Sequence, residues 1–175
     1  MEPALVPLHG FEAPPPLSVR VALFAAAGLV ATVAMNLPMK RLREGQTPPF
    51  VAAGALTGEP PAEVSPALAS AVHYVAGALA GVLFALLSAL LGRPAVGLPA
   101  EPHLPGTTIS TVPAALAALA TFGFLYGFFG AVVLPRFGGP VRERARRVRR
   151  DWAVSATVYT VVLVVTATGL TAAFA

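Results

Sequence analysis

Residues 67–91 read ALASAVHYVAGALAGVLFALLSALL, and they contain no Asp, Glu, Lys or Arg. A helix needs about 20 mostly apolar residues to cross the roughly 30 Å hydrocarbon core of a bilayer. Ser65 and Pro66 precede the stretch as a capping residue followed by proline at the first helical position, and Gly92 and Pro94 follow it. The stretch therefore predicts a helix that spans a membrane.

Three further windows have the same character and predict three more spans, at residues 19–37, 112–134 and 152–174. Apart from Arg20 at the edge of the first window, they contain no charged residue. Helix is expected because an open strand would leave its backbone groups unpaired in lipid. Charged residues make up 11% of the 175, against about 25% in soluble domains. We expect an all-α fold: one transmembrane domain over residues 1–175, an integral membrane four-helix bundle.

The basic residues are distributed unevenly among the loops. The loop after the first span holds three and the loop after the third span holds seven, so these loops contain ten of the 12 Lys and Arg residues. Short loops rich in Lys and Arg stay on the cytoplasmic side of a membrane. We therefore expect a multi-pass protein of the cell membrane with both termini extracytoplasmic. The first apolar run is expected to be an anchor rather than a signal peptide, because no basic residue precedes Arg20.

Each cytoplasmic loop is expected to contribute a short helix at the membrane interface. The first loop contains TPPFVAAGALTGEPP, in which Thr47 can cap a helix that begins at Pro48. The third loop predicts an amphipathic basic helix over residues 140–151, continuous with the fourth span. Its apolar positions recur at the spacing of one helix face: Val141, Ala145, Val148 and Trp152.

Arginines occupy the remaining faces of residues 140–151. The set is Arg142, Arg144, Arg146, Arg147, Arg149 and Arg150. Each arginine near an anionic leaflet contributes about 1 kcal/mol of attraction, so we interpret the set as lipid-binding, with anionic headgroups of membrane lipids as the partner. Docking of an acidic cytoplasmic protein is the alternative. Nucleic-acid binding is not expected, because no aromatic platform is interleaved with the charges.

His73 is the one ionisable residue expected well inside a span, about 10 Å along its helix from Pro66 at 1.5 Å per residue. It shares a helix face with Gly77 and Gly81, and Asn36 lies near the same end of the adjacent antiparallel helix. Small residues permit close helix approach, and polar side chains then bond across the contact. We interpret these four residues as a polar helix seam. A gating or ligand-binding role for His73, or binding of a metal or haem, is the competing interpretation.

Two other glycine spacings indicate similar contacts. Gly28 lies four residues before Thr32 on the first span, and Gly123 lies four residues before Gly127 on the third. We expect both pairs to meet neighbouring helices. The aromatic run TFGFLYGFFG at residues 121–130 is expected to fill the grooves that its glycines leave, in preference to forming a ligand cage.

The chain lacks the residue groups on which most catalysis depends. It has no cysteine, which excludes thiolate chemistry and disulfides, and its three histidines are far apart, with His9 and His103 expected on the opposite side from His73. The single aspartate, Asp151, lies at a membrane edge. We therefore expect no catalytic residues, no metal site, no cofactor and no enzymatic activity.

Two apolar runs, GLVATVAMNLPMK (residues 28–40) and HYVAGALAGVLFALL (residues 73–87), flank a proline-rich loop. They resemble small multi-span prokaryotic membrane proteins of uncharacterised function, with YagU-type inner-membrane proteins as the nearest family. The resemblance covers the first two spans and extends to YGFFGAVVLPRFG (residues 126–138). It implies a multi-span fold and brings no established catalytic residues. The scarcity of Lys, Ile and Asn, once each, is also typical of a GC-rich prokaryotic genome.

The sequence therefore predicts a polytopic integral membrane protein. The most consistent role is structural or accessory, with a second copy of the chain or a larger membrane protein as partner. The alternative is a small-solute channel or transporter that acts as a homo-oligomer, because four short helices alone enclose little pore.

Overall fold

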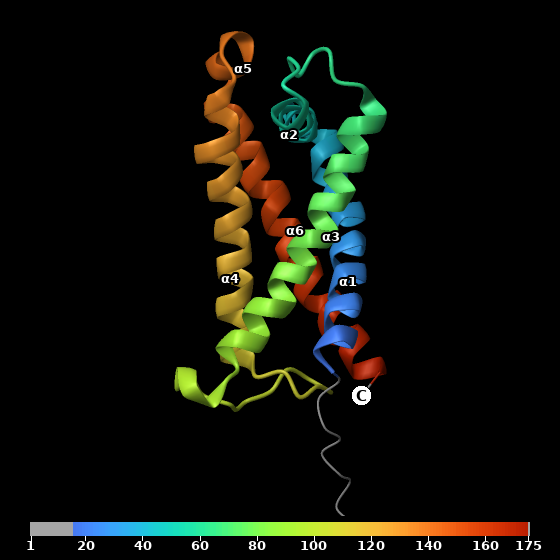
Figure 1. The fold of residues 1–175 in the computed structure, drawn as a ribbon, viewed down its shortest axis with the longest axis vertical. Helices are drawn as coiled ribbons and strands as arrows, with labels where there is room; N and C mark the ends of the chain where they lie inside the picture. Colours follow the sequence, from blue (N-terminus) through green and yellow to red (C-terminus); the bar gives the residue numbers. More distant parts are fainter. Residues whose placement is uncertain (1–15, 175) are drawn as a thin grey trace, which may run out of the picture.

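A computed structural model describes residues 16–174, and its regular structure is helical (Figure 1). Four long helices form a bundle: α1 (Leu17–Arg41), α3 (Pro66–Leu91), α4 (Thr111–Gly127) and α6 (Ala145–Ala173). A π-helical turn, η2 (Phe128–Val133), and a 3-10 turn, η3 (Leu134–Arg136), prolong α4, and another 3-10 turn, η1 (Pro94–Val96), follows α3. Two short helices, α2 (Thr47–Thr57) and α5 (Gly139–Glu143), lie at one end of the bundle. The predicted all-α four-helix bundle is confirmed.

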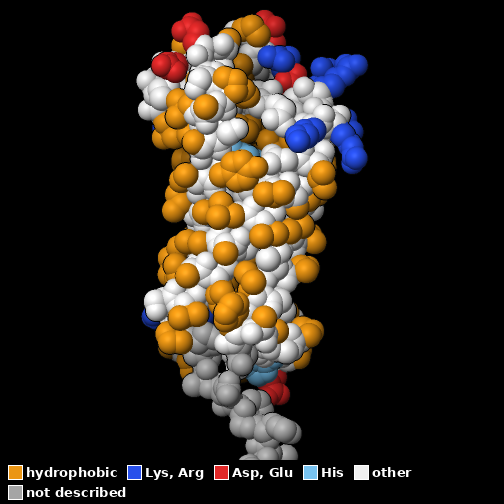
Figure 2. Space-filling view, turned by 90° about the vertical axis from the view of Figure 1, so that its right-hand side faces the viewer, with side chains coloured by type: hydrophobic (Ala, Val, Ile, Leu, Met, Phe, Trp, Pro, Cys, Tyr) orange, Lys and Arg blue, Asp and Glu red, His pale blue; other side chains and the backbone are white. Residues whose placement is uncertain are grey.

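All four long helices are long and apolar enough to cross a membrane. They comprise 25, 26, 26 and 29 residues when η2 and η3 are counted with α4, or roughly 37 to 44 Å at 1.5 Å per residue. Hydrophobic side chains cover most of the shaft of the molecule, whereas most charged side chains gather at one end (Figure 2). We call that end, which carries α2, α5 and the start of α6, the arginine-rich end.

The main core lies between α1, α3 and α6. Helix α1 packs along both of the others, the rings of Phe24 and Phe84 stack with centroids 5.4 Å apart, and Leu163 is fully buried. Helix α4 packs less extensively against α3 and α6, and it diverges from α3 toward the arginine-rich end (Figure 1). Helix α2 occupies the wedge that opens between them and contacts both α3 and η2.

Helix boundaries follow the expected residues at some positions and not at others. Ser65 caps α3, its hydroxyl accepting a hydrogen bond from the Leu68 amide at 3.2 Å. Thr47 does not cap α2 as expected, because its hydroxyl instead donates to the Glu44 carboxylate at 2.8 Å. Helix α1 continues through Pro38 to Arg41, although an interior proline removes one helical hydrogen bond and its ring crowds the carbonyl four residues earlier.

The third span is not the uniform helix that residues 112–134 predict. The α-helix ends at Gly127, and the chain continues as the π turn η2. Gly123, Gly127 and Gly130 weaken the α-helix here, because glycine has a low helix propensity. π-helical turns occur frequently at functional sites.

The basic helix expected over residues 140–151 is likewise broken. Helix α5 ends at Glu143 and α6 begins at Ala145, with Arg144 between them at φ −97° and ψ 3°. Its side chain is held from two directions, by the Pro140 carbonyl and by Glu44. The expected apolar face is confirmed: four residues on it, Val141, Ala145, Val148 and Trp152, pack into a second core with Val51, Phe129, Val133 and Leu134.

Candidate functional site

Helices α1 and α3 cross at glycines, as the seam interpretation expected. A Cβ added to Gly81 would overlap the carbonyl oxygen of Phe24, and one added to Gly77 would overlap the hydroxyl of Thr32. A Cβ on Gly28 would in turn overlap the Gly77 carbonyl oxygen. Only glycine therefore permits the two backbones to approach so closely.

Asn36 and His73 meet at the arginine-rich side of this crossing. Asn36 Oδ1 lies 3.1 Å from His73 Nε2, and Asn36 Nδ2 donates to the Tyr74 hydroxyl at 3.1 Å. With the amide in this orientation, Nε2 is the donor, so Nδ1 is the unprotonated nitrogen of the ring. Nδ1 makes no hydrogen bond with any other residue between 16 and 174. The ring thus keeps one free polar atom.

Tyr159 joins α6 to the same crossing of α1 and α3. Its hydroxyl donates to the Gly77 carbonyl at 2.6 Å, and the residue is 1% exposed. Tyr159 was not among the residues predicted to form the seam. The available signal was a phenol placed near the middle of an otherwise valine-rich span, where a polar tip requires a partner.

Gly123 and Gly127 do not form the helix contact expected of them. A Cβ added to either glycine would meet no atom of the described chain within 4 Å, apart from neighbouring residues and the helix backbone itself. Helix α4 packs inward through a different face, formed by Ala114, Ala117 and Thr121. The two glycines therefore lie on the outside of this bundle.

The aromatic run of α4 is only partly a packing element. Phe124 and Phe128 stack on each other with centroids 5.4 Å apart, yet they are 53% and 48% exposed. Phe129 is buried against Trp152. The expectation that the whole run fills glycine grooves is therefore wrong for Phe124 and Phe128, which face outward.

A cavity of about 420 Å³ opens between α3 and α4 beneath α2. One wall is α3, from Val72 to Leu83, and the other is formed by Phe124, Leu125 and the π turn. Pro48, Pro49 and Ala52 of α2 close it at the arginine-rich end, and Trp152 of α6 also lines it. His73 and Trp152 are the polar side chains on its lining, so the cavity is apolar with two polar points.

Side chains of α6 donate hydrogen bonds to two backbone carbonyl groups beside this cavity. Trp152 Nε1 donates to the Leu125 carbonyl at 3.2 Å, and Arg149 donates to the Gly130 carbonyl at 3.0 Å. Gly130 lies within η2, where the α-helical ladder is interrupted, and Leu125 lies in α4 three residues before η2 begins. Helix α6 thus stabilises the π turn and shapes the cavity wall.

An ionic cluster with buried carboxylates lies at the arginine-rich end. The Glu44 side chain is 4% exposed, and both of its oxygens lie 3.0 Å from Arg144 Nη1. Thr47 donates to the same carboxylate, and Asp151, itself 6% exposed, accepts from the Glu44 amide at 3.0 Å. The cluster joins the α1–α2 turn to the α5–α6 junction.

The six arginines predicted to bind lipid are used in different ways. Arg144 binds Glu44 and the Pro140 carbonyl, and Arg149 binds the Gly130 carbonyl. Three others, Arg146, Arg147 and Arg150, are exposed and line a hollow of about 520 Å³ together with Arg144 and Glu143. Arg142 is exposed outside that hollow. The structure therefore divides the predicted set into members that brace the fold and members that face outward.

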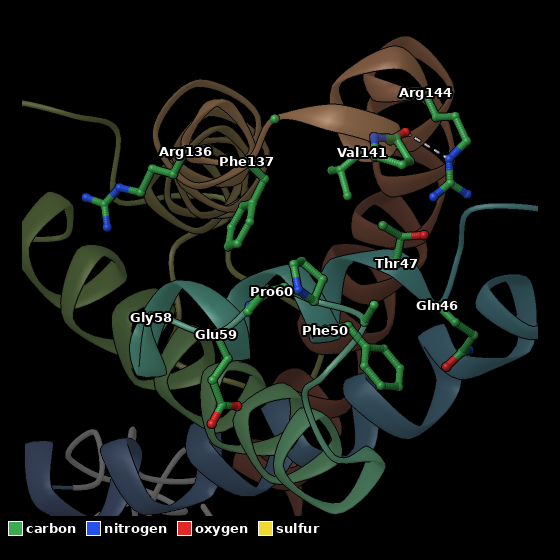
Figure 3. A pocket seen from close by; sticks show the side chains of 14 residues that line it. Gln46, Thr47, Phe50, Gly58, Glu59, Pro60, Arg136, Phe137, Val141 and Arg144 are labelled. Atoms are coloured by element: carbon green, nitrogen blue, oxygen red, sulfur yellow. Dashed lines mark hydrogen bonds between the residues drawn. The ribbon is translucent and has the colours of Figure 1, made fainter.

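A second hollow at this end, of about 680 Å³, lies above α2 (Figure 3). Phe50, Thr47 and the turn at Gly58 to Pro60 line one side, and Phe137, Val141 and Arg144 line the other. It is separated from the cavity between α3 and α4 by α2 itself, which contributes residues to both. Within residues 16–174, no group of three His, Asp or Glu side chains is placed to hold a metal.

A comparison with known protein families, with curated proteins and with solved structures found no match. The YagU-type resemblance therefore stays a prediction. The class follows from the fold, since four long apolar helices packed as a bundle indicate a small multi-span membrane protein.

Proposed function

We propose that the protein is a structural or accessory component of the membrane, without enzymatic activity, that binds anionic lipid headgroups at its arginine-rich end. One observation carries the proposal: Arg146, Arg147 and Arg150 are exposed and line one hollow at the start of the fourth span. Guanidinium groups bind phosphate through paired hydrogen bonds, which suits them to lipid headgroups.

The position of the hollow along α6 supports a lipid partner. Residues 152–173 of the same helix are uncharged and reach to its far end, so the arginines sit where the helix would leave the hydrocarbon. Trp152 follows directly, and tryptophan is enriched at the interface between membrane and water. Glu143 also lines the hollow and is the one carboxylate there, which leaves an excess of positive charge.

The proposed orientation has the arginine-rich end in the cytoplasm. Ten of the 12 Lys and Arg residues lie in the two loops that meet there. The start of α1 and the end of α6 lie at the opposite end of the bundle in Figure 1, which supports extracytoplasmic termini. The anionic cytoplasmic leaflet would then face the exposed arginines.

Lipid retention by charge-matched variants tests the headgroup site. The purified protein is equilibrated with vesicles of phosphatidylcholine and phosphatidylglycerol, and the retained lipid is measured by native mass spectrometry. A triple variant, Arg146→Gln, Arg147→Gln and Arg150→Gln, should lose most of the retained anionic lipid. The control replaces Arg41, Arg43 and Arg142 with glutamine. These arginines are also exposed, and their replacement removes the same charge from the same end of the bundle. Equal loss in both variants would contradict a defined site.

The accessory role is tested separately by the mass of the native assembly. Extracted in mild detergent from its own membrane, the protein should run as an assembly heavier than its 17.9 kDa chain. Integer multiples of that mass would indicate self-association, and other masses a second protein. A monomer at all detergent concentrations would contradict the accessory role and leave the lipid result untouched.

A further inference from the structure

We infer that the cavity between α3 and α4 binds a membrane amphiphile with a long apolar chain and a hydroxyl group, the hydroxyl bonding to His73. This cavity is separate from the hollow that Arg146, Arg147 and Arg150 line. The evidence for the ligand is the opening of the cavity, its apolar lining and the unbonded Nδ1 of His73.

The cavity opens sideways, toward the surroundings of the bundle. Leu79, Phe124 and Phe128 line it and are 62%, 53% and 48% exposed, so they form its outer rim. Helix α2 closes it at the arginine-rich end with two prolines. In a membrane, the molecules that reach this opening are lipids, and they enter between α3 and α4.

The volume and lining suit a chain molecule rather than water. About 420 Å³ lies within the roughly 300–1,000 Å³ range of small-molecule sites. Apolar cavities do not hold ordered water, because a water molecule needs two to four polar partners. Along α3 the lining runs from Val72 to Leu83, which corresponds to about 16 Å at 1.5 Å per residue. The cavity is therefore long enough to enclose part of an extended hydrocarbon chain.

His73 determines which polar group the ligand must carry. Trp152, the other polar side chain on the lining, already donates its only N–H to Leu125. His73 uses Nε2 on Asn36 and leaves Nδ1 without a partner among residues 16–174. A polar atom that faces hydrocarbon is unfavourable unless it is bonded. A hydroxyl donates to this nitrogen, whereas an ester or an ether offers no proton.

The depth of His73 agrees with such a ligand. The residue lies seven positions after Pro66, about 10 Å along α3 from the arginine-rich end. A hydroxyl at that depth, with its chain extending past Leu79 and Leu83, places the molecule in one leaflet and parallel to its neighbours. Acyl glycerols with a free hydroxyl and isoprenoid alcohols share this chemistry.

The single tryptophan of the chain provides the test, because Trp152 lines the cavity. The full-length protein is reconstituted in phosphatidylcholine nanodiscs, and quenching of Trp152 fluorescence is titrated with a chain-brominated long-chain alcohol and with its methyl ether. The alcohol should reach half-maximal quenching at a concentration about 3-fold to 20-fold lower, the range that corresponds to single hydrogen bonds measured in membranes. Equal quenching by both compounds would overturn the role of His73.

Two variants distinguish binding in the cavity from contact of Trp152 with the surrounding lipid. Ala76→Phe fills the cavity and should abolish preferential quenching by the alcohol, whereas Val75→Phe, at an adjacent residue that is 58% exposed and off the lining, should preserve it. An unchanged preference in Ala76→Phe would overturn the site. Unlabelled diacylglycerol and an unlabelled isoprenoid alcohol are then used as competitors, and the one that relieves quenching identifies the source. Relief by neither would also count against the inference.

Discussion

The hydroxyl oxygen of Tyr159 lies 2.6 Å from the carbonyl oxygen of Gly77. This contact joins α6 to the point where α1 and α3 approach most closely, because Gly77 also lies against Gly28 and Thr32. One side chain therefore binds the third helix to the crossing of the other two. The contact explains why a tyrosine stands in the interior of an apolar span.

Tyr159→Phe should lower the free energy of unfolding by roughly 0.6–1.7 kcal/mol, the range measured for hydrogen bonds between membrane helices. The variant keeps the ring and removes only the hydroxyl. Unfolding in a denaturing detergent titration measures the change. Tyr126→Phe is the control, because the Tyr126 hydroxyl has no bond to another residue in the described part of the chain. Equal effects of the two variants would contradict the proposed role of Tyr159.

Gly81→Leu and Gly77→Leu should each destabilise the bundle more than His73→Gln does. A leucine at position 81 must displace the backbone of α1 at Phe24, and one at position 77 must displace the Thr32 side chain. Overpacking typically costs about 1–3 kcal/mol or more. Glutamine at position 73 keeps a donor and an acceptor for Asn36. Thermal unfolding in detergent ranks the variants.

Gly123→Leu serves as the control for these glycine variants, since its added side chain would point away from the rest of the bundle. It should leave thermal stability of the monomer unchanged. If His73→Gln left stability intact but abolished alcohol-dependent quenching, His73 would act in ligand binding rather than in packing. A loss of stability in Gly123→Leu as large as in Gly81→Leu would contradict the observed helix arrangement.

Arg144→Gln should destabilise the arginine-rich end more than Glu44→Gln does. The Glu44 side chain is 4% exposed and the Arg144 side chain 47%, so removing the arginine leaves a buried carboxylate without its cation and beside Asp151. Removing the glutamate charge leaves an arginine that water still solvates. The difference should be about 1–3 kcal/mol, the usual cost of an unsatisfied buried group. Hydrogen exchange of residues 44–57 reports it.

The double variant Arg144→Gln with Glu44→Gln provides the control for that comparison. It should be more stable than Arg144→Gln alone, because the buried charge is gone. Equal exchange in the two single variants, or a larger effect from Glu44→Gln, would show that the pair is not what holds α2 to α5 and α6.

Reporter fusions after Arg43, Pro99, Arg144 and Ala175 should alternate between cytoplasmic and external signals, beginning in the cytoplasm. The reason is the excess of Lys and Arg in the first and third loops. A reporter that is active only in the cytoplasm is paired with one that is active only outside. An external signal from the Arg144 fusion would refute the orientation.

Much of the fold and part of the site followed from local pattern. The four apolar runs led directly to four helices, and Ser65-Pro66 marked the start of α3. Asn36 and His73 were paired correctly, because their depths along antiparallel helices are set by residue counts. The apolar face over 141–152 was likewise readable, since its spacing is that of one helix face.

Other features depended on partners that lie far away in the sequence. Gly123 and Gly127 have the same spacing as Gly77 and Gly81 but lie outside the bundle. Spacing places residues on one face of a helix and does not say which face meets a neighbour. Arg144, which stands at the break between α5 and α6, likewise binds Glu44, which is 100 residues away.

The sequence by itself determined that the chain forms apolar helices of membrane-spanning length, because burying an uncharged run of that length in lipid requires helix regardless of its neighbours. It also determined the uneven charge of the two ends. Only the tertiary structure decided which glycines lie where two helices cross and which arginines line an exposed hollow. It also decided that α3 and α4 separate to leave a cavity beside His73. These depend on how side chains from four helices fit together, and small differences in packing between alternative faces select one arrangement.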